Sequence, residues 1–182
     1  FVEKFTKDEL DYINKKTNHG ELFIVKKEYF GFLKRSTIID KHPRLVFSKI
    51  MKILYNYDHN YWNNYVKQEN NVFIHSSAKI SKNVIIFPNV VIGPNCTVGE
   101  NTIIKSNTVI GQPGFGIIID PENLNHDHLP HIGGVKIGSN VEIGASNTIA
   151  SGTIYQTILR DYVKTDDHVH VAHNCLIEKG VI

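Results

Sequence analysis

Three histidines near the C-terminal end of the sequence have the residue type and spacing to do chemistry. They fall in HVHVAHNCLI, where His173 is followed directly by Asn174. An imidazole can bind a metal ion, fill a core position, or accept and return a proton near neutral pH. The backbone that carries these residues decides between the three roles.

A metal site is the first possibility, because HDHLPH (126–131) repeats the His-x-His-x-x-His spacing of HVHVAH (168–173). Alternate residues of a strand face one side, so the first two histidines of such a segment could converge on zinc. No cysteine or carboxylate stands at a supporting spacing. We therefore predict no metal, and we expect His126 and His128 to be exposed loop residues.

A repeat of six residues predicts the backbone. Every sixth residue from 74 to 110 is isoleucine or valine. Three residues after most of them comes an asparagine: Asn83, Asn89, Asn95, Asn101 and Asn107. Asparagine tolerates the left-handed conformation of a tight turn better than most residues with a side chain. Each unit is therefore predicted to be a short strand with an inward aliphatic residue, followed by a corner.

Hexapeptide repeats are a signature of the β-helix, in which three units close one triangular coil. The period resumes after a gap and, with a small phase slip, runs on to the end: Ile137, Ile143, Ile149, Leu159, Thr165, Val171 and Ile177. We predict a mainly β fold, a left-handed parallel β-helix over 72–182. Cys96 and Cys175 occupy small inward positions, where a free cysteine packs as a small hydrophobic residue.

Two interruptions break the repeat. Residues 111–134 are rich in glycine, proline and histidine and are predicted to form a loop insertion, a type of segment that is often functional. At residues 152–161 the spacing between inward positions is about four residues longer than the repeat of six. This longer spacing predicts a bulge at one corner.

A different pattern precedes the β-helix. Residues 1–55 are predicted to form a small α/β domain with two short strands around a turn and a helix within 41–55, where Pro43 suits the first turn. Residues 56–71 are polar and aromatic without a period, and we expect a linker.

Composition excludes several classes of protein. The 182 residues carry a net charge of +2, with no basic run that would favour nucleic acid. No apolar stretch approaches the length of a membrane-spanning helix. Two cysteines do not make a disulfide framework, so we expect a protein of the reducing cytoplasm. We also expect no signal peptide.

The ordered motifs resemble one family over nearly the whole chain, the UDP-3-O-acylglucosamine N-acyltransferases of lipid A synthesis (LpxD). The similar segments are PRLVFSKIMKILY (43–55), IHSSAKI (74–80), GQPGFGI (111–117), PHIGGVKIGSNVEIGASNTIASG (130–152) and VHVAHNCLI (169–177). The resemblance implies a homotrimer with active sites between neighbours. It also implies a nucleotide-sugar acceptor and a phosphopantetheine thioester donor on acyl carrier protein or coenzyme A, with no tightly bound cofactor.

The resemblance also implies roles for particular residues. His173 would be the general base, in the family's Ala-His-Asn segment. Substrate-binding residues would be Asn174, Gly114, Phe115, Gly116, Phe23 and Tyr29. Of these, Phe23 and Tyr29 would sandwich uracil, although a gap-free alignment on Gly20 selects Ile24 and Phe30 instead.

Two departures from the family pattern leave the substrate open. Ala150-Ser151-Gly152 stands where the family usually has Asp-Arg-Gly. The sequence also ends inside a coil, whereas the family continues with further coils and C-terminal helices that meet acyl carrier protein. Relatives from surface-polysaccharide clusters share much of the pattern and acylate other sugars.

The expected chemistry is direct attack of a sugar amine on a thioester. The base His173 follows the inward Val171 by two residues, so we expect it to face outward near a corner. A backbone N–H at the corner would stabilise the oxyanion, and no nucleophile is paired with a base for a covalent intermediate. The alternatives are an acetyl-CoA-dependent N- or O-acetyltransferase of an O-antigen sugar and a non-catalytic trimeric scaffold.

Overall fold

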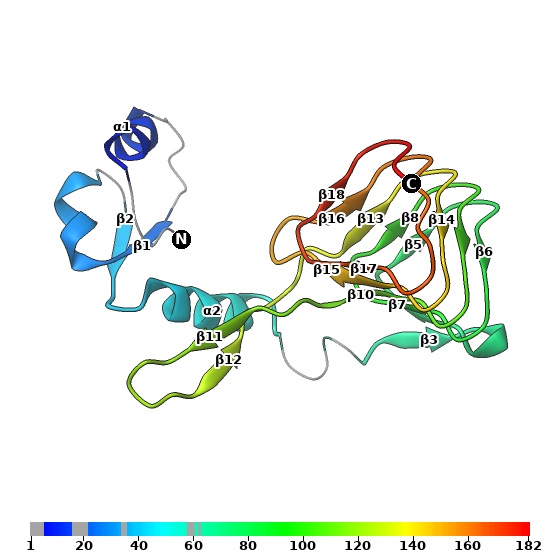
Figure 1. The fold of residues 1–182 in the computed structure, drawn as a ribbon. Coiled ribbons are helices and arrows are strands. Elements are labelled where there is room, and N and C mark those ends of the chain that lie inside the picture. Colours follow the sequence, from blue (N-terminus) through cyan, green and yellow to red (C-terminus); the bar gives the residue numbers. More distant parts are fainter. Residues whose placement is uncertain (1–5, 16–21, 34–35, 58–60, 62) are drawn as a thin grey trace. The chain divides into compact units, whose positions relative to one another are not determined.

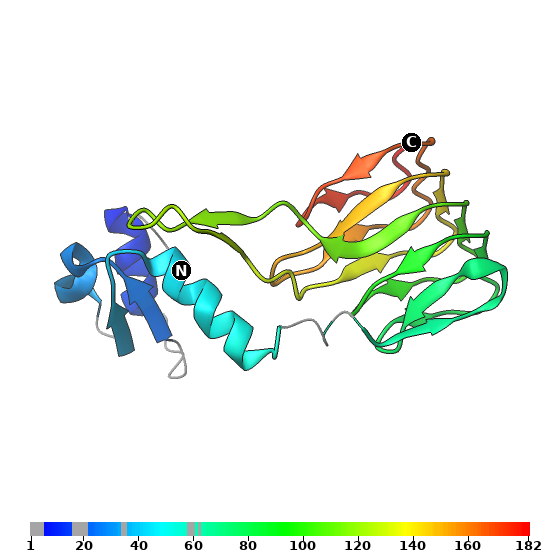
Figure 2. The same cartoon turned by 90° about the horizontal axis from the view of Figure 1, so that it is seen from below.

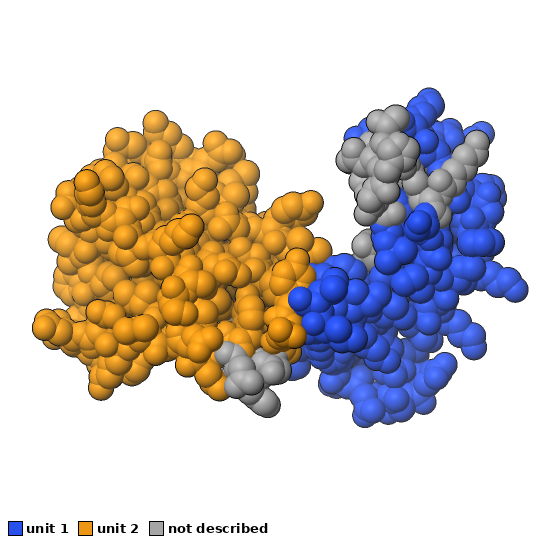
Figure 3. Space-filling model, turned by 180° about the vertical axis from the view of Figure 1, so that it is seen from behind, with its two compact units in different colours: residues 1–54, 117–128 blue, residues 55–116, 129–182 orange. Residues whose placement is uncertain are grey.

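The computed structural model describes residues 6–15, 22–33, 36–57, 61 and 63–182. The chain divides into two compact units (Figure 3). Unit 1 comprises Phe1–Leu54 with Ile117–His128, and unit 2 comprises Tyr55–Gly116 with Leu129–Ile182. This division differs from the predicted one because part of the loop insertion belongs with the N-terminal residues.

Unit 2 is a β-helix of three sheets whose strands follow one another around the faces of a prism (Figure 1). The first sheet contains β4 (Phe73–His75), β7 (Val91–Ile92), β10 (Val109–Pro113), β15 (Thr148–Ser151) and β17 (His170–Val171). The second contains β5 (Lys79–Ile80), β8 (Thr97–Val98), β13 (Val135–Ile137), β16 (Thr157–Leu159) and β18 (Leu176–Ile177). The third contains β6 (Ile85–Ile86), β9 (Ile103–Ile104) and β14 (Glu142–Ile143). Successive rungs pair in parallel, as Figure 2 shows from another side.

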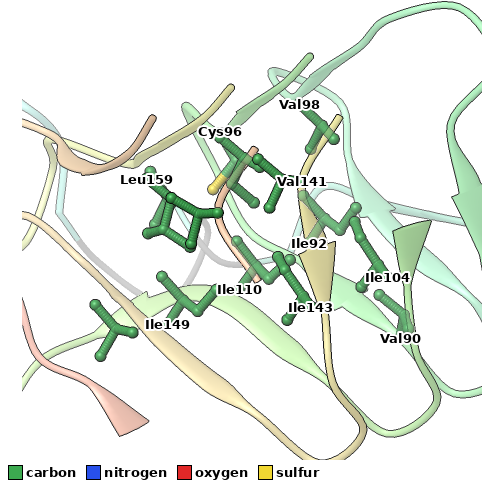
Figure 4. Packing of buried hydrophobic residues seen from close by; sticks show 14 of the residues in the cluster. Val90, Ile92, Cys96, Val98, Ile104, Ile110, Val141, Ile143, Ile149 and Leu159 are labelled. Atoms are coloured by element: carbon green, nitrogen blue, oxygen red, sulfur yellow. The ribbon is translucent and has the colours of Figure 1, made fainter. Parts of the chain in front are cut away.

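The register of the sheets places each inward aliphatic residue over the one before it. In the first sheet this column runs Ile74, Ile92, Ile110, Ile149 and Val171. The columns of the three sheets meet in one buried cluster, part of which Figure 4 shows. Full burial of one such side chain stabilises the fold by about 1.5–3 kcal/mol. Cys96 is buried in this cluster and Cys175 packs against it, as predicted.

The corners are made by the predicted residues. Asn83, Asn89, Asn95, Asn101 and Asn107 all have left-handed backbone conformations, with φ between 56° and 62°. Their side chains also connect successive rungs, since the Asn83 amide donates to Asn101 Oδ1 at 3.2 Å and the Asn89 amide donates to Asn107 Oδ1 at 3.2 Å. The six-residue pattern therefore predicted both the strands and the turns.

After the loop insertion the strands resume the columns of the earlier rungs, since Ile137 pairs with Val98 and Ile143 with Ile104. The insertion contains an antiparallel hairpin of β11 (Ile117–Ile119) and β12 (His126–His128). Where the chain returns, the buried Thr102 hydroxyl donates to Gly138 O at 3.0 Å and accepts from Val141 N at 3.3 Å. A buried threonine thus satisfies backbone groups of the next rung, which would otherwise be costly to bury.

The predicted linker 56–71 contains structure of its own. β3 (Tyr65–Lys67) pairs antiparallel with β4 at the edge of the first sheet, and η3 (Glu69–Asn71) follows it. The Tyr65 hydroxyl accepts a hydrogen bond from Gln112 at 2.8 Å, and its ring packs edge-on against His75. Tyr65 thus packs on the prism through contacts of its own, which a period in the sequence does not report.

Unit 1 begins with a helix that was not predicted, α1 (Lys7–Lys15). Thr6 and Glu9 cap it reciprocally, because Glu9 N donates to Thr6 Oγ1 and Thr6 N donates to Glu9 Oε2. The two predicted strands are β1 (Leu22–Val25) and β2 (Ser36–Ile39). They pair in parallel, and the 3₁₀ helix η1 (Lys27–Phe32) lies in the connection between them.

The predicted helix is present as α2 (Pro43–Leu54), and Pro43 is its first residue. The hairpin of the loop insertion is held on this helix. Asp127 of β12 accepts a hydrogen bond from Ser48 at 3.4 Å and forms an ion pair with Lys52. These contacts explain why residues 117–128 group with unit 1. Among the helices in the described ranges, none is long and apolar enough to cross a membrane.

Candidate active site

His173 lies at the corner that follows β17, where the sequence predicted an outward-facing residue. Val171, two residues earlier, points into the core and is 7% exposed. The His173 side chain is half-buried, so its ring borders solvent without being sealed in the prism. The next residue, Asn174, makes the turn with φ of 61°.

The Asn174 side chain is fixed by three hydrogen bonds to two residues. Its Oδ1 accepts from Thr153 N at 3.2 Å and Thr153 Oγ1 at 3.0 Å, while its Nδ2 donates to Tyr155 O at 3.0 Å. An N–H can only donate and a backbone carbonyl can only accept. The orientation of the amide is therefore determined by its partners. Thr153 and Tyr155 were not identified from the sequence, since they lie in the predicted corner bulge.

This amide in turn sets the tautomer of His173. His173 Nδ1 lies 2.9 Å from Asn174 Oδ1, an atom that can only accept. Nδ1 must then carry the proton, which leaves Nε2 of the neutral ring with an unprotonated lone pair. The arrangement has the form of a base with an orienting partner, as general-base catalysis requires.

The predicted substrate loop, Gly114–Gly116, lies against this histidine. A Cβ on Gly114 would come within 2.6 Å of His173 Cδ2, so only glycine allows the backbone to approach this closely. Phe115, between the two glycines, is 90% exposed. The structure thus brings Gly114 to the Cδ2 edge and Asn174 to the Nδ1 edge of the His173 ring.

His131 also lies at this site. Its contact with His173 was not predicted from the sequence. His131 is 1% exposed, and its ring centroid lies 4.9 Å from that of His173 with an interplanar angle of 70°. A Cβ on Gly116 would come within 2.7 Å of His131 Cε1. The signal available in the sequence was its setting, because Leu129, Pro130 and Ile132 around it are apolar.

Ala150 and Ser151, which depart from the resembled Asp-Arg-Gly pattern, are both buried. Ser151 Oγ accepts from Gly134 N at 2.9 Å and donates to His131 O at 3.3 Å. These positions therefore support the backbone that carries His131, and neither side chain is exposed for direct contact with a substrate.

The segment 126–131, a predicted alternative for a metal site, is divided between the two units. His126 and His128 are exposed on β12 in unit 1, whereas His131 belongs to unit 2. Within the described ranges, no three His, Cys, Asp or Glu side chains lie where they could hold a metal ion. Cys96 is no candidate nucleophile, because burial raises the pKa of its thiol to about 12.

The predicted uracil-binding pair lies in unit 1. Phe23 is on β1 and Tyr29 is on η1, and both side chains are half-buried. Of the alternative pair, Ile24 is 6% exposed and belongs to the core, so it cannot offer a face to a base. The half-buried aromatic residues remain the better candidates for stacking.

Comparisons with known proteins agree with the repeat. The family model described as bacterial transferase hexapeptide (six repeats) matches residues 77–112. UDP-3-O-acylglucosamine N-acyltransferase 2 of Legionella pneumophila is 45% identical over 73 residues, which are 40% of this chain and 21% of that protein. UDP-3-O-acylglucosamine N-acyltransferase 1 of Francisella tularensis subsp. holarctica is 38% identical over 110 residues, which are 60% of this chain and 32% of that protein.

Among solved structures, serine acetyltransferase 1 from Entamoeba histolytica covers 77% of this chain and 48% of its own, with 21% identity and a TM-score of 0.38. The chain spans less than a third of the length of the two curated relatives described above. The family model and these relatives confirm the expected likeness to hexapeptide acyltransferases.

Proposed function

We infer that this protein transfers an acyl group from a thioester to the amino group of a nucleotide-activated sugar. The chain carries hexapeptide transferase repeats and is similar to UDP-3-O-acylglucosamine N-acyltransferases, which supports this inference. The observation that carries the proposal is the distance of 2.9 Å between His173 Nδ1 and Asn174 Oδ1. Because this oxygen can only accept, Nδ1 holds the proton and Nε2 is proposed as the proton acceptor.

The proposed reaction needs no covalent enzyme intermediate. The neutral sugar amine attacks the thioester carbonyl carbon, and His173 Nε2 takes a proton from the nitrogen as the carbon–nitrogen bond forms. The carbon–sulfur bond then breaks, and the imidazolium returns the proton to the leaving thiolate. Imidazole is the side chain best suited to both transfers near neutral pH. A backbone N–H at the corner is proposed to stabilise the oxyanion.

Several finer features belong to the same proposal. The prism is a left-handed helix and the protein a homotrimer, with His173 facing a neighbouring subunit. Unit 1 contains the small domain predicted over 1–55, and Phe23 and Tyr29 bind the uracil of a UDP-sugar. The donor is acyl carrier protein in the cytoplasm, and its phosphopantetheine arm brings the thioester. The likeness to enzymes named for a UDP-sugar supports these features.

A second candidate is an acetyl-CoA-dependent N- or O-acetyltransferase. The burial of Ala150 and Ser151 favours it, because the polar side chains expected there are absent from the surface beside His173. The choice of acceptor and acyl chain would then differ from that of the resembled family.

The test is a screen of the purified protein for turnover. Acetyl-CoA and hydroxyacyl carrier protein are each offered with UDP- and dTDP-aminosugars, and products are identified by mass spectrometry. We expect an N-acylated UDP-sugar formed from acyl carrier protein. Turnover with acetyl-CoA alone would select the second candidate. If no thioester is consumed and no nucleotide sugar binds, the acyltransferase proposal fails and a scaffold role is favoured.

A further inference from the structure

His131 is held in place more firmly than a residue of a surface loop needs to be. Its Nδ1 lies 2.8 Å from Leu129 O, so this nitrogen donates to the carbonyl. Its backbone N–H donates to the Tyr57 hydroxyl at 3.4 Å, and its carbonyl accepts from Ser151 at 3.3 Å. Three contacts therefore fix both the backbone and the ring of one buried histidine.

The His131 ring supports the ring of His173. The centroids are 4.9 Å apart and the planes are 70° apart, the edge-to-face arrangement that aromatic pairs favour. Asn174 fixes the Nδ1 edge of His173, but one hydrogen bond leaves the ring able to rotate about its χ2 torsion. A second contact, made through the ring, restricts that rotation.

The Gly114–Gly116 loop closes around both rings. A Cβ on Gly114 would lie 2.6 Å from His173 Cδ2 and 3.0 Å from His131 Nε2. A Cβ on Gly116 would lie 2.7 Å from His131 Cε1. The two glycines thus allow backbone to pack where side chains would separate the histidines.

We propose that His131 is a positioning residue for His173: its buried ring, in edge-to-face contact with His173 and enclosed by the two glycines, holds the plane of the His173 imidazole so that Nε2 faces the acceptor amine. The inference rests on the proposed function for its catalytic meaning. The positioning itself concerns the orientation and tautomer of one ring and can be measured without turnover.

Two substitutions separate the ring of His131 from its hydrogen bond. His131→Asn can keep a donor for Leu129 O but removes the part of the ring that contacts His173. His131→Phe keeps a ring but loses the donor. The control is His126→Asn, which makes the same change at an exposed histidine of β12. All are made in the full chain, and kcat, KM, melting temperature and the ¹⁵N resonances of the His173 ring are measured.

We expect His131→Asn to lower kcat by about 10- to 100-fold, because small misplacements of a catalytic group cost this much. KM for the acceptor should change less than about threefold, since His131 does not touch substrate. The His173 ring should change from the Nδ1–H tautomer to a mixture. We expect His131→Phe and His126→Asn to retain kcat within about threefold and to keep the wild-type tautomer.

The outcomes distinguish the two proposals. If wild type turns over substrates while His131→Asn keeps kcat and the His173 tautomer unchanged, positioning is wrong and the acyltransferase function stands. If wild type has no activity, the function is wrong, and the ¹⁵N resonances still decide the positioning. Should His131→Asn not fold, folded His131→Phe decides: a loss above about tenfold in kcat contradicts support through the ring.

Discussion

At the scale of single residues, the proposed chemistry depends on which nitrogen of His173 carries a proton. The sequence predicted that His173 faces outward, because the six-residue period places it two positions after an inward valine. It could not predict the tautomer. The partners that orient Asn174 are Thr153 and Tyr155, which are 21 and 19 residues away along the chain and meet it only through the stacking of rungs.

Replacing Asn174 by alanine tests this orientation. We expect Asn174→Ala to lower kcat by about tenfold or more, because the His173 ring loses the acceptor that holds its Nδ1 proton. The matched control is Asn140→Ala at another left-handed corner, where φ is 58°. Both variants carry the same backbone cost, so steady-state kinetics at equal folded fraction isolate the effect on His173. Equal kcat in the two variants would refute the orienting role.

At the scale of elements, the fold repeats one device, a short strand followed by a left-handed corner. This device could be predicted from the sequence because most units between residues 74 and 110 carry their own signal, an inward aliphatic residue and an asparagine. The hairpin β11–β12, helix α1 and strand β3 carry no such period. The positions of such elements depend on particular contacts between distant residues, such as the ion pair of Asp127 with Lys52. Local sequence patterns do not reveal these contacts.

The corners give a prediction on stability. We expect Asn101→Ala to lower the free energy of unfolding by about 1 kcal/mol more than Asn101→Gly does, because alanine is strained at a φ of 57° and glycine is not. Both substitutions remove the hydrogen bond from Asn83, so their difference isolates the backbone conformation. Urea unfolding measures it. If the alanine and glycine variants are equally stable, the backbone of the corner must adjust so that alanine is not strained there.

The Gly114–Gly116 loop gives a prediction on activity. A methyl group on Gly114 meets both His173 and His131, so we expect Gly114→Ala to lower kcat at least about tenfold by displacing the base. The control is Gly31→Ala, because nothing lies within 4 Å of a Cβ at that position. Steady-state kinetics of the two variants provide the comparison. Full activity in Gly114→Ala would mean that the loop does not constrain His173.

At the scale of the whole molecule, the division into two units was only partly predictable. The sequence pattern predicted a first domain over 1–55, a linker over 56–71 and a β-helix from 72, whereas the second unit of the structure begins at Tyr55. No local signal indicated that residues 117–128 belong to the first unit. Parts of the candidate site were predicted from the family resemblance, namely His173, Asn174 and Gly114. His131 required the structure, since its ring reaches His173 only after the insertion folds.

The proposed trimer is tested by mass. Sedimentation equilibrium should give three times the chain mass of 20.7 kDa, because a site that faces a neighbouring subunit requires that subunit to be present. If the protein is strictly monomeric and still turns over substrate, the active site does not need a neighbouring subunit, and His173 remains the proposed base.

The proposed reaction requires Nε2 of His173 to accept the proton of the attacking amine, and kcat of His173→Ala with the substrates found in the screen measures this requirement. We expect kcat to fall about 10²- to 10⁴-fold while the melting temperature stays unchanged. A folded His173→Ala variant that keeps kcat within about tenfold of wild type would contradict it.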